Sequence, residues 1–153
     1  MNAADVDKIV SGAVKKALSE KNSVTPHGGI TLRAAEALIK RVFEAAKAMG
    51  LSVFAAVTDN GANPVAVARM DGAILASYDI ALNKAYTSAA LHKSTAELSE
   101  LSASGGELYG IQHTNGGRIV IFGGGEPLYR DGTVAGAIGV SGGTLAQDTE
   151  LAT

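Results

Sequence analysis

The chain has 153 residues, no cysteine and a formal net charge of −2, which together exclude several classes of protein. Without cysteine it can form no disulfide, no thiolate metal site and no thiol nucleophile. Its 13 basic and 15 acidic residues include no basic run, which argues against nucleic-acid binding. No apolar stretch approaches the ~20 residues of a membrane span, and the first residues do not resemble an export signal, so we expect a cytoplasmic protein with no membrane partner.

The length predicts a single domain over residues 1–153, long enough to bury roughly 68–70% of its unfolded surface without cross-links. Within it we expect an N-terminal helix and loop over residues 1–30 and a core over residues 31–148. The chain contains 19 glycines, abundant alanine and no tryptophan. Small side chains let elements approach closely but bury little apolar area each, so association into a homo-oligomer is expected to supplement stability.

The first half of the chain changes from a helical to a strand-like apolar period. Apolar spacing predicts two helices, the second capped by Thr31 and followed by Gly50 in the left-handed position. Alternation then predicts a β-hairpin around an Asp-Asn-Gly turn. The predicted elements are helices over residues 4–18 and 31–49, a Pro/Gly loop over 24–29, and strands over 52–58 and 64–70.

The second half predicts two more helices, a glycine-rich strand meander and a terminal helix. Ser77 is expected to cap a helix running to about residue 92, and a capping-box spacing begins a short helix at Ser94. Strands are predicted over residues 118–122 and 133–140, and Thr144 is expected to cap the final helix.

The strand over residues 133–140 has two unlike faces. Its larger side chains share one face, and the opposite face is thin enough for a helix to lie close. The thin face consists of Ala135, Ala137 and Gly139. Strands joined by short turns, together with segregated helices, predict an α+β fold with an antiparallel sheet.

Several motifs, in this order along the chain, resemble those of the GlcG/HbpS family of haem- and corrinoid-associated proteins. They are Thr58–Gly61 with Val65–Ala73, then Asp79–Ala89, then Gly123–Leu128, and last Gly136–Gly143 with Asp148. The resemblance implies a five-stranded antiparallel sheet flanked by helices in a profilin-like layering. It also implies assembly into dimers, tetramers or octamers, and haem or cobalamin as the cofactor.

Members of this family accompany glycolate and diol-dehydratase operons, and one forms the C-terminal domain of PduO-type corrinoid adenosyltransferases. No adenosyltransferase domain is visible in this sequence, so adenosyl transfer is not expected. The resemblance therefore implies a ligand-binding accessory of diol, glycerol or glycolate metabolism.

Three histidines are candidate metal ligands, because neutral imidazole binds haem iron and could replace the lower ligand of a corrinoid cobalt. His27 lies in the predicted Pro/Gly loop, from which it could reach a ligand; a solvated loop histidine is the simpler reading of this residue alone. His92 is expected to stabilise a helix C-terminus. His113 is expected to be a turn residue.

Two polar groups could hold an anion. The backbone amides of Gly142 and Gly143, before a helix, suit a carboxylate or phosphate, although a tight turn alone would also require these glycines. Arg69, Asp71 and Lys84 could bind a carboxylate, or form a structural ion pair between hairpin and helix, which is the favoured interpretation. Asp148 is expected to be a cap residue.

These features leave three hypotheses for the function. The first is an oligomeric module that binds haem or a corrinoid. The second is an enzyme that acts on a small oxygenated metabolite, with Arg69, Asp71 and Lys84 around an anion pocket. The third is a structural assembly subunit. No nucleophile triad, carboxylate pair or metal-ligand spacing rises above chance, so catalysis is the less favoured alternative.

Overall fold

A computed structural model describes residues 12, 16–19 and 23–153 of the chain. The predicted helix over residues 4–18 therefore falls largely outside the described residues. No helix in the part of the chain described here combines the length and apolar character needed to cross a membrane. The elements are α2 (Leu32–Ala48), β1 (Phe54–Asp59), β2 (Pro64–Arg69), α3 (Ser77–Leu91), α4 (Thr95–Leu101), η1 (Ile111–His113), η2 (Asn115–Gly117), β3 (Gly125–Arg130), β4 (Thr133–Ser141) and α5 (Leu145–Ala152).

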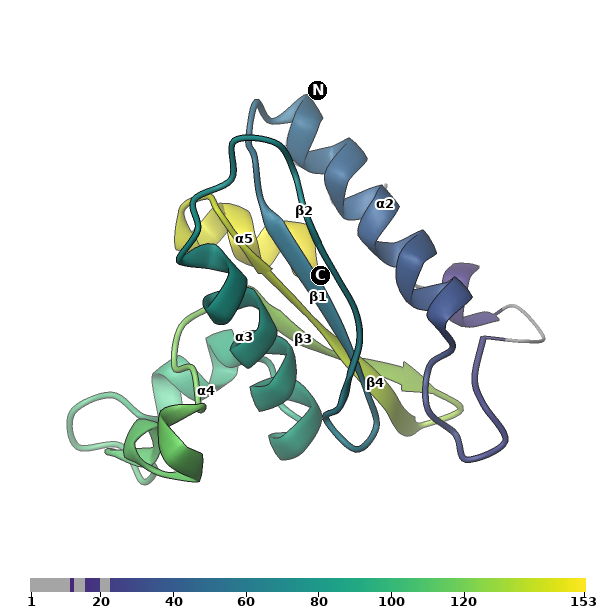
Figure 1. Cartoon of the computed structure of the whole chain (residues 1–153). Helices are drawn as coiled ribbons and strands as arrows, with labels where there is room; N and C mark the ends of the chain where they lie inside the picture. The colour runs from purple at the N-terminus through teal and green to yellow at the C-terminus, as the bar shows by residue number, and fades with distance from the viewer. Residues whose placement is uncertain (1–11, 13–15, 20–22) are drawn as a thin grey trace.

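The strands form one antiparallel sheet in the order β2-β1-β4-β3 (Figure 1). The α+β class is therefore confirmed, but within the described residues the sheet has four strands where five were expected. The predicted strand over residues 118–122 is the one that does not form. Its backbone is instead bonded to a helix side chain: the Val120 amide donates to Oγ1 of Thr87 at 3.0 Å, and that hydroxyl lies 3.3 Å from the Arg118 carbonyl.

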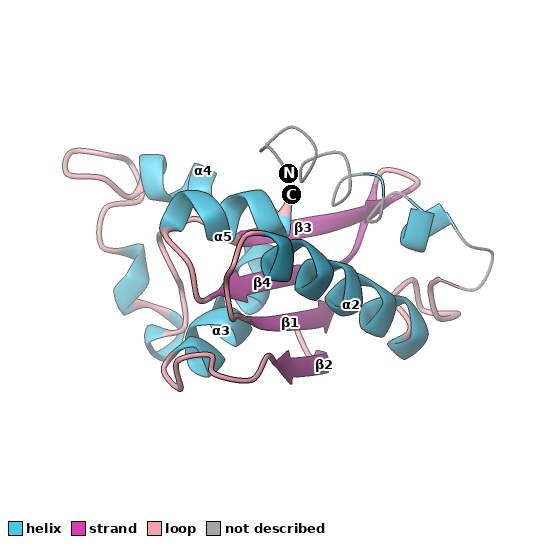
Figure 2. Cartoon of the chain, turned by 90° about the horizontal axis from the view of Figure 1, so that it is seen from above, coloured by secondary structure: helices cyan, strands magenta, loops and turns pink. Residues whose placement is uncertain are grey.

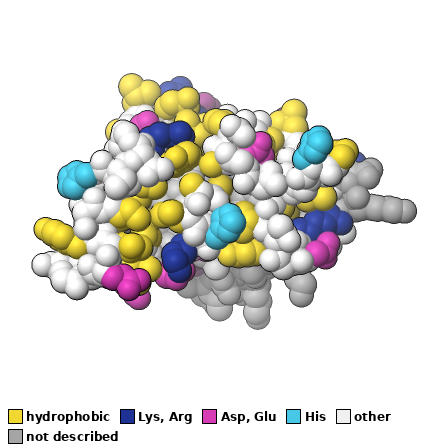
Figure 3. Space-filling view, turned by 90° about the horizontal axis from the view of Figure 1, so that it is seen from below, with side chains coloured by type: hydrophobic (Ala, Val, Ile, Leu, Met, Phe, Trp, Pro, Cys, Tyr) yellow, Lys and Arg dark blue, Asp and Glu magenta, His cyan; other side chains and the backbone are white. Residues whose placement is uncertain are grey.

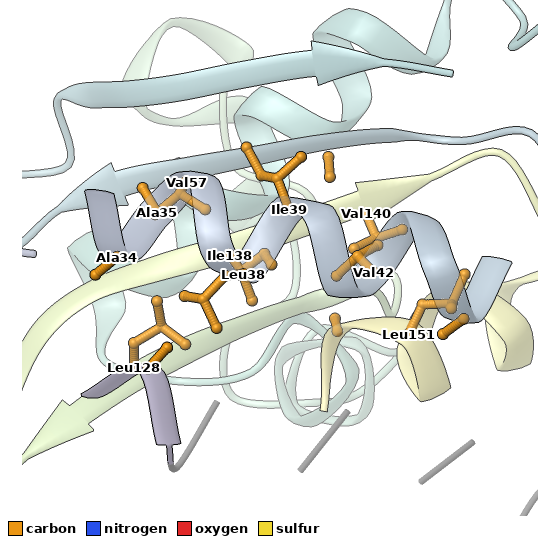
Figure 4. Packing of buried hydrophobic residues seen from close by; sticks show 14 of the residues in the cluster. Ala34, Ala35, Leu38, Ile39, Val42, Val57, Leu128, Ile138, Val140 and Leu151 are labelled. Carbon is orange, nitrogen blue, oxygen red and sulfur yellow. The ribbon is translucent and has the colours of Figure 1, made fainter. Parts of the chain in front are cut away.

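The helices cover both faces of the sheet, as Figure 2 shows from above. On one face, α2 and α5 bury the main core against Val57, Ile138 and Val140 (Figure 4). On the other face, α3 packs through Ala81 and Ala85. The result is a three-layer domain with the sheet in the middle.

The long helix α2 forms as its sequence predicts. The hydroxyl of Thr31 accepts a hydrogen bond from the Ala34 amide at 3.3 Å, which caps the helix. Leu38 and Val42 lie on the predicted apolar stripe and are only 1% and 2% exposed. Gly50 ends the helix at a φ of 71°, a left-handed conformation that costs glycine little.

The thin face of β4 receives α3, as predicted. A Cβ atom added to Gly139 would lie 2.1 Å from the carbonyl oxygen of Ala81, so only glycine permits this approach of helix and strand. The predicted cap at Ser77 is wrong, because Ala76 is the N-cap of α3 and has no side-chain cap bond. The Ser77 hydroxyl instead lies 3.1 Å from that of Ser141 on β4.

Candidate ligand-binding groove

A groove of about 1020 Å³ lies between α2 and β2. It forms because β2 is an edge strand, so that the outer side of this strand has no neighbour in the sheet. Its apolar lining comes from both walls and from the segment that joins α2 to β1. These residues are Leu32, Ile39, Phe43, Leu51, Val65, Val67 and Met70. Such a mostly apolar concavity is the usual form of a small-molecule site.

The two walls of the groove run in the same direction. The chain leaves α2 and enters β1 within a few residues, and Phe54 at the start of β1 pairs with Arg69 at the end of β2. The last turn of α2 and the last residues of β2 therefore lie at one end of the groove, which we call the Arg69 end. The span from Glu36 to Lys47 on the helix and that from Val65 to Met70 along the strand are each about 16 Å long.

His27 does not line the groove but lies beside the β1–β2 turn, at the end of this hairpin opposite Arg69. Its side chain is exposed, and its backbone carbonyl accepts a hydrogen bond from Nδ2 of Asn60, in the β1–β2 turn, at 3.2 Å. The loop is closed by Thr25, whose amide donates to the Gly29 carbonyl, and is anchored to β4 where the Ile30 amide donates to Ala135 at 2.8 Å. These bonds fix the backbone of the loop that precedes α2.

Arg69 and Asp71 lie at the Arg69 end of the groove, where both contribute to the lining and both are exposed. The Arg69 guanidinium lies 6.0 Å from the ring centre of Phe54. Lys47, in the last turn of α2, adds a second cation to this end. Two of the predicted site residues therefore share this end of the groove.

Gly142 and Gly143 lie behind the groove wall that Leu51 and Ser52 form. A Cβ atom on Gly142 would be 2.5 Å from the Ser52 carbonyl oxygen, so the glycine permits close packing. The amide of Gly143 already donates to Oδ1 of Asp148 at 2.8 Å. The Gly143 amide, which could have bound an external anion, is therefore already bonded to the carboxylate of Asp148.

Lys84 does not join Arg69 and Asp71, which corrects the predicted polar set. Its ammonium is fully buried and lies 2.8 Å from both Oδ2 of Asp148 and the carbonyl oxygen of Val140. Burial lowers the pKa of Lys84, while the hydrogen bond and the charge of Asp148 act in the opposite direction. The favoured interpretation, a structural ion pair between hairpin and helix, is also corrected: Lys84 forms a buried ion pair, but its partner Asp148 lies on α5.

Two acidic residues that sequence reasoning missed lie near each other beside the opposite edge of the sheet. Glu126 on β3 is half-buried, and its loss of water, together with the nearby charge of Glu97 on α4, raises its pKa to about 7. The motif around Glu126 gave no sign of this, because the shift depends on the packing of α4. No group of three metal-ligating side chains occurs among the described residues.

The other two histidines do not line the groove either. His92 ends α3 in a left-handed conformation, with its carbonyl accepting from the Tyr129 hydroxyl at 3.2 Å. His113 ends η1. Histidine side chains stand exposed on the face drawn in Figure 3, consistent with the exposure of all three.

The fold and motifs agree with a match of residues 30–153 to the sequence model of the haem-degrading HbpS-like family. The chain belongs to this family. A relative from Citrobacter freundii, an uncharacterized 15.0 kDa protein of the dhaT–dhaS intergenic region, is 47% identical over 123 residues, which are 80% of this chain and 87% of the relative. The resemblance expected from the motifs is thus confirmed.

Two further comparisons concern PduO proteins. The corrinoid adenosyltransferase PduO of Salmonella typhimurium is 36% identical over 115 residues, which are 75% of this chain but only 34% of PduO. The crystal structure of a PduOC–haem complex superposes with a TM-score of 0.73 at 33% identity, covering 85% of this chain and 90% of that one. The similarity therefore concerns one part of PduO.

Proposed function

We propose that this protein binds haem: the His27 imidazole would hold the iron, and the α2–β2 groove would supply the apolar surface for the macrocycle. The observations that carry the proposal are an apolar groove of about 1020 Å³ between α2 and β2 and an exposed histidine, His27, whose loop is bonded to the β1–β2 turn. The haem complex of PduOC and the haem-related description of the family support it.

The residues of the groove fit the chemistry of haem. Phe43 and Val67 offer apolar contact to a flat macrocycle, and imidazole is a frequent axial ligand of haem iron. Lys47 and Arg69 offer cations to carboxylate groups. When bound, haem would supply an iron centre for ligand binding or electron transfer, while the chain holds and partly shields it.

A corrinoid is the alternative occupant of the same groove, because its cobalt also accepts imidazole. The names of the relatives point to diol metabolism in its broad sense, through a dhaT–dhaS intergenic protein and a corrinoid adenosyltransferase. We therefore propose that the protein is an accessory of such a pathway. Comparing the binding of haem and of a corrinoid would identify the ligand.

The structure gives little support to the enzymatic alternative. Lys84 has no exposed surface, and the Gly143 amide is bonded to Asp148. A substrate in the groove would therefore meet neither of these two predicted anion-binding groups. A binding role for the exposed residues of the groove agrees better with this arrangement.

The test is a titration of the purified protein with hemin and, separately, with hydroxocobalamin, followed by absorption spectroscopy. Hemin is expected to give a shifted Soret band. His27→Ala is expected to lower the affinity for hemin at least ~10-fold, because a ligand of the iron is lost. His113→Ala is the matched control, since it removes an exposed histidine distant in sequence from the groove. Unchanged spectra of both free tetrapyrroles would refute the proposal and favour a structural subunit.

A further inference from the structure

Arg118 is an exposed arginine whose side chain is held in one position against α3. Its guanidinium carbon lies 3.6 Å from the ring centre of Tyr86, so the guanidinium rests on the aromatic ring. Its Nε donates a hydrogen bond to Oδ1 of Asn83 at 3.2 Å. Together the two contacts fix both where the guanidinium lies and how it is turned, whereas an arginine without such contacts would sample many rotamers.

The backbone around Arg118 is fixed as well. Its amide donates to the Asn115 carbonyl at 3.3 Å, and its carbonyl oxygen lies 3.3 Å from the Thr87 hydroxyl on α3. Asn115 and the two glycines that follow it all have positive φ, so the chain turns sharply just before Arg118. Nδ2 of Asn115 donates to the Tyr86 hydroxyl at 3.1 Å, which ties this turn to the same aromatic side chain.

The guanidinium of Arg118 has no acidic partner in the part of the chain that the structure describes, since none of the ion pairs there includes it. Its Nη1 and Nη2 atoms likewise donate to no described residue. Asn83 occupies the Nε side of the group and Tyr86 covers one face, so the edge that carries Nη1 and Nη2 is left for a ligand. Because the folded protein already orders this group, a ligand binds it without the entropy loss of ordering a mobile side chain.

We infer that this edge of Arg118 binds the carboxylate of a small acid, with Nη1 and Nη2 each donating to one carboxylate oxygen. The planar fork of a guanidinium matches the two oxygens of a carboxylate. One cation balances one negative charge. Asp79, exposed one helical turn before Asn83, adds a negative charge to this side of α3 and so disfavours a doubly charged phosphate. The ligand class is therefore a small monocarboxylate.

This carboxylate site is separate from the groove proposed for haem. Arg118, Tyr86 and Asn83 do not line the groove, and α3 covers the face of the sheet opposite α2 (Figure 2). Neither His27 nor any residue of the groove takes part in it. The site therefore stands or fails independently of haem binding, and its test uses no haem.

Acetate is the probe, titrated into the isotope-labelled full chain at constant pH, with sodium chloride keeping the ionic strength constant. Nuclear magnetic resonance resolves the Nε–H signals of individual arginines. The Arg118 signal is expected to shift and to saturate with a Kd of ~1–10 mM, while the signal of Arg41 on α2 stays in place. A shift that chloride alone reproduces, or one that does not saturate by ~100 mM acetate, would overturn the site.

Four variants separate the guanidinium fork from simple charge, with backbone amide signals of residues 115–118 as the readout and as a check of folding. Arg118→Lys keeps the charge without the fork and should weaken acetate binding at least ~5-fold. Tyr86→Leu removes the ring that holds the guanidinium and should weaken it at least ~3-fold. Asp79→Asn removes a nearby negative charge and should strengthen binding about 2-fold. Arg41→Lys, the matched control, should bind like the wild type.

Two outcomes would contradict the inference. If Arg118→Lys bound acetate as tightly as the wild type does, a bidentate guanidinium site would be excluded. If phosphate at the same ionic strength bound more tightly than acetate, the assignment to a monocarboxylate would be wrong.

Discussion

The ammonium of Lys84 lies 2.8 Å from Oδ2 of Asp148, with 0% and 4% of the two side chains exposed. Removing one partner of such a pair leaves an uncompensated buried charge, so Lys84→Met is expected to lower the free energy of unfolding by roughly 3–5 kcal/mol. Lys84→Met/Asp148→Asn should recover part of this loss, because the amide oxygen can still accept from Gly143. Urea denaturation of the three proteins gives the comparison.

The exposed pair of Lys93 and Glu97 is the matched control, with 40% and 50% of its side chains exposed at a distance of 2.7 Å. Water and salt screen such a pair, so Lys93→Met should leave the denaturation midpoint almost unchanged. If Lys84→Met and Lys93→Met lowered the free energy of unfolding by equal amounts, burial would not be what decides the strength of the Lys84 pair.

Glu126 makes stability depend on pH. Its pKa is about 7 in the folded protein against 4.5 as the ordinary value, so the folded state binds the proton more tightly. This contribution is fully present below about pH 4.5 and is lost as the pH rises through 7. Glu126→Gln should therefore be more stable than the wild type at pH 8 and should show no such gain at acidic pH.

Thermal unfolding across this pH range measures the difference. Glu97→Gln removes the neighbouring charge, which is the smaller cause of the raised pKa of Glu126. In a Glu97→Gln background, the gain in stability from Glu126→Gln at pH 8 should therefore be smaller but still present. A Glu126→Gln variant whose stability stays parallel to that of the wild type at every pH would contradict the prediction.

Gly139 sets the distance between α3 and the sheet. A Cβ atom there would lie 2.1 Å from the Ala81 carbonyl oxygen and 2.6 Å from the Ala85 amide, both of which are backbone atoms. Gly139→Ala should therefore cost at least the ~1–3 kcal/mol typical of overpacking. The reverse change on the same face, Ala137→Gly, should cost only about 0.5–1 kcal/mol. Urea denaturation gives the free energies of unfolding of both variants. If the two variants lost similar amounts of stability, close packing at Gly139 would not be the cause.

Thr87 bonds the backbone of residues 118–122, the segment that was predicted to be a strand. Thr87→Val keeps the shape of the side chain but leaves the Val120 amide without its acceptor, which should cost about 1–3 kcal/mol. Hydrogen exchange at residues 118–122 should accelerate, while that of β1 and β4 stays protected. Thr133→Val, at an exposed strand position, is the control. Unchanged exchange in this segment would mean that other contacts hold it.

Local signals were enough to predict most of the elements. Thr31, Ser94 and Thr144 each accept from the amide three residues later, as their sequence patterns indicate. In the hairpin turn, Oδ1 of Asp59 accepts from the amides of Gly61 and Asn63 at 2.8 and 2.9 Å. These interactions join residues close in sequence, so their residue types identify them.

The failures concern contacts between residues far apart in sequence. Residues 118–122 have the composition of a strand, but the Thr87 hydroxyl, more than 30 positions earlier, bonds their backbone. Lys84 was assigned to the neighbouring hairpin, and its partner is 64 positions away. Its place among the small residues of α3 could have indicated burial, since a lysine there needs a compensating charge. The groove likewise depends on the packing of α2 beside an edge strand.

The distance along the chain between Lys84 and Asp148 has a consequence for biosynthesis. On the ribosome, α3 and the hairpin are synthesised well before α5, so the lysine has no counter-charge while the earlier segments emerge. Packing α3 onto the sheet at that stage would bury the Lys84 ammonium group without a counter-charge. We therefore expect α3 to complete its packing on the sheet only after α5 has emerged from the ribosome, and a chain truncated before α5 to be less stable.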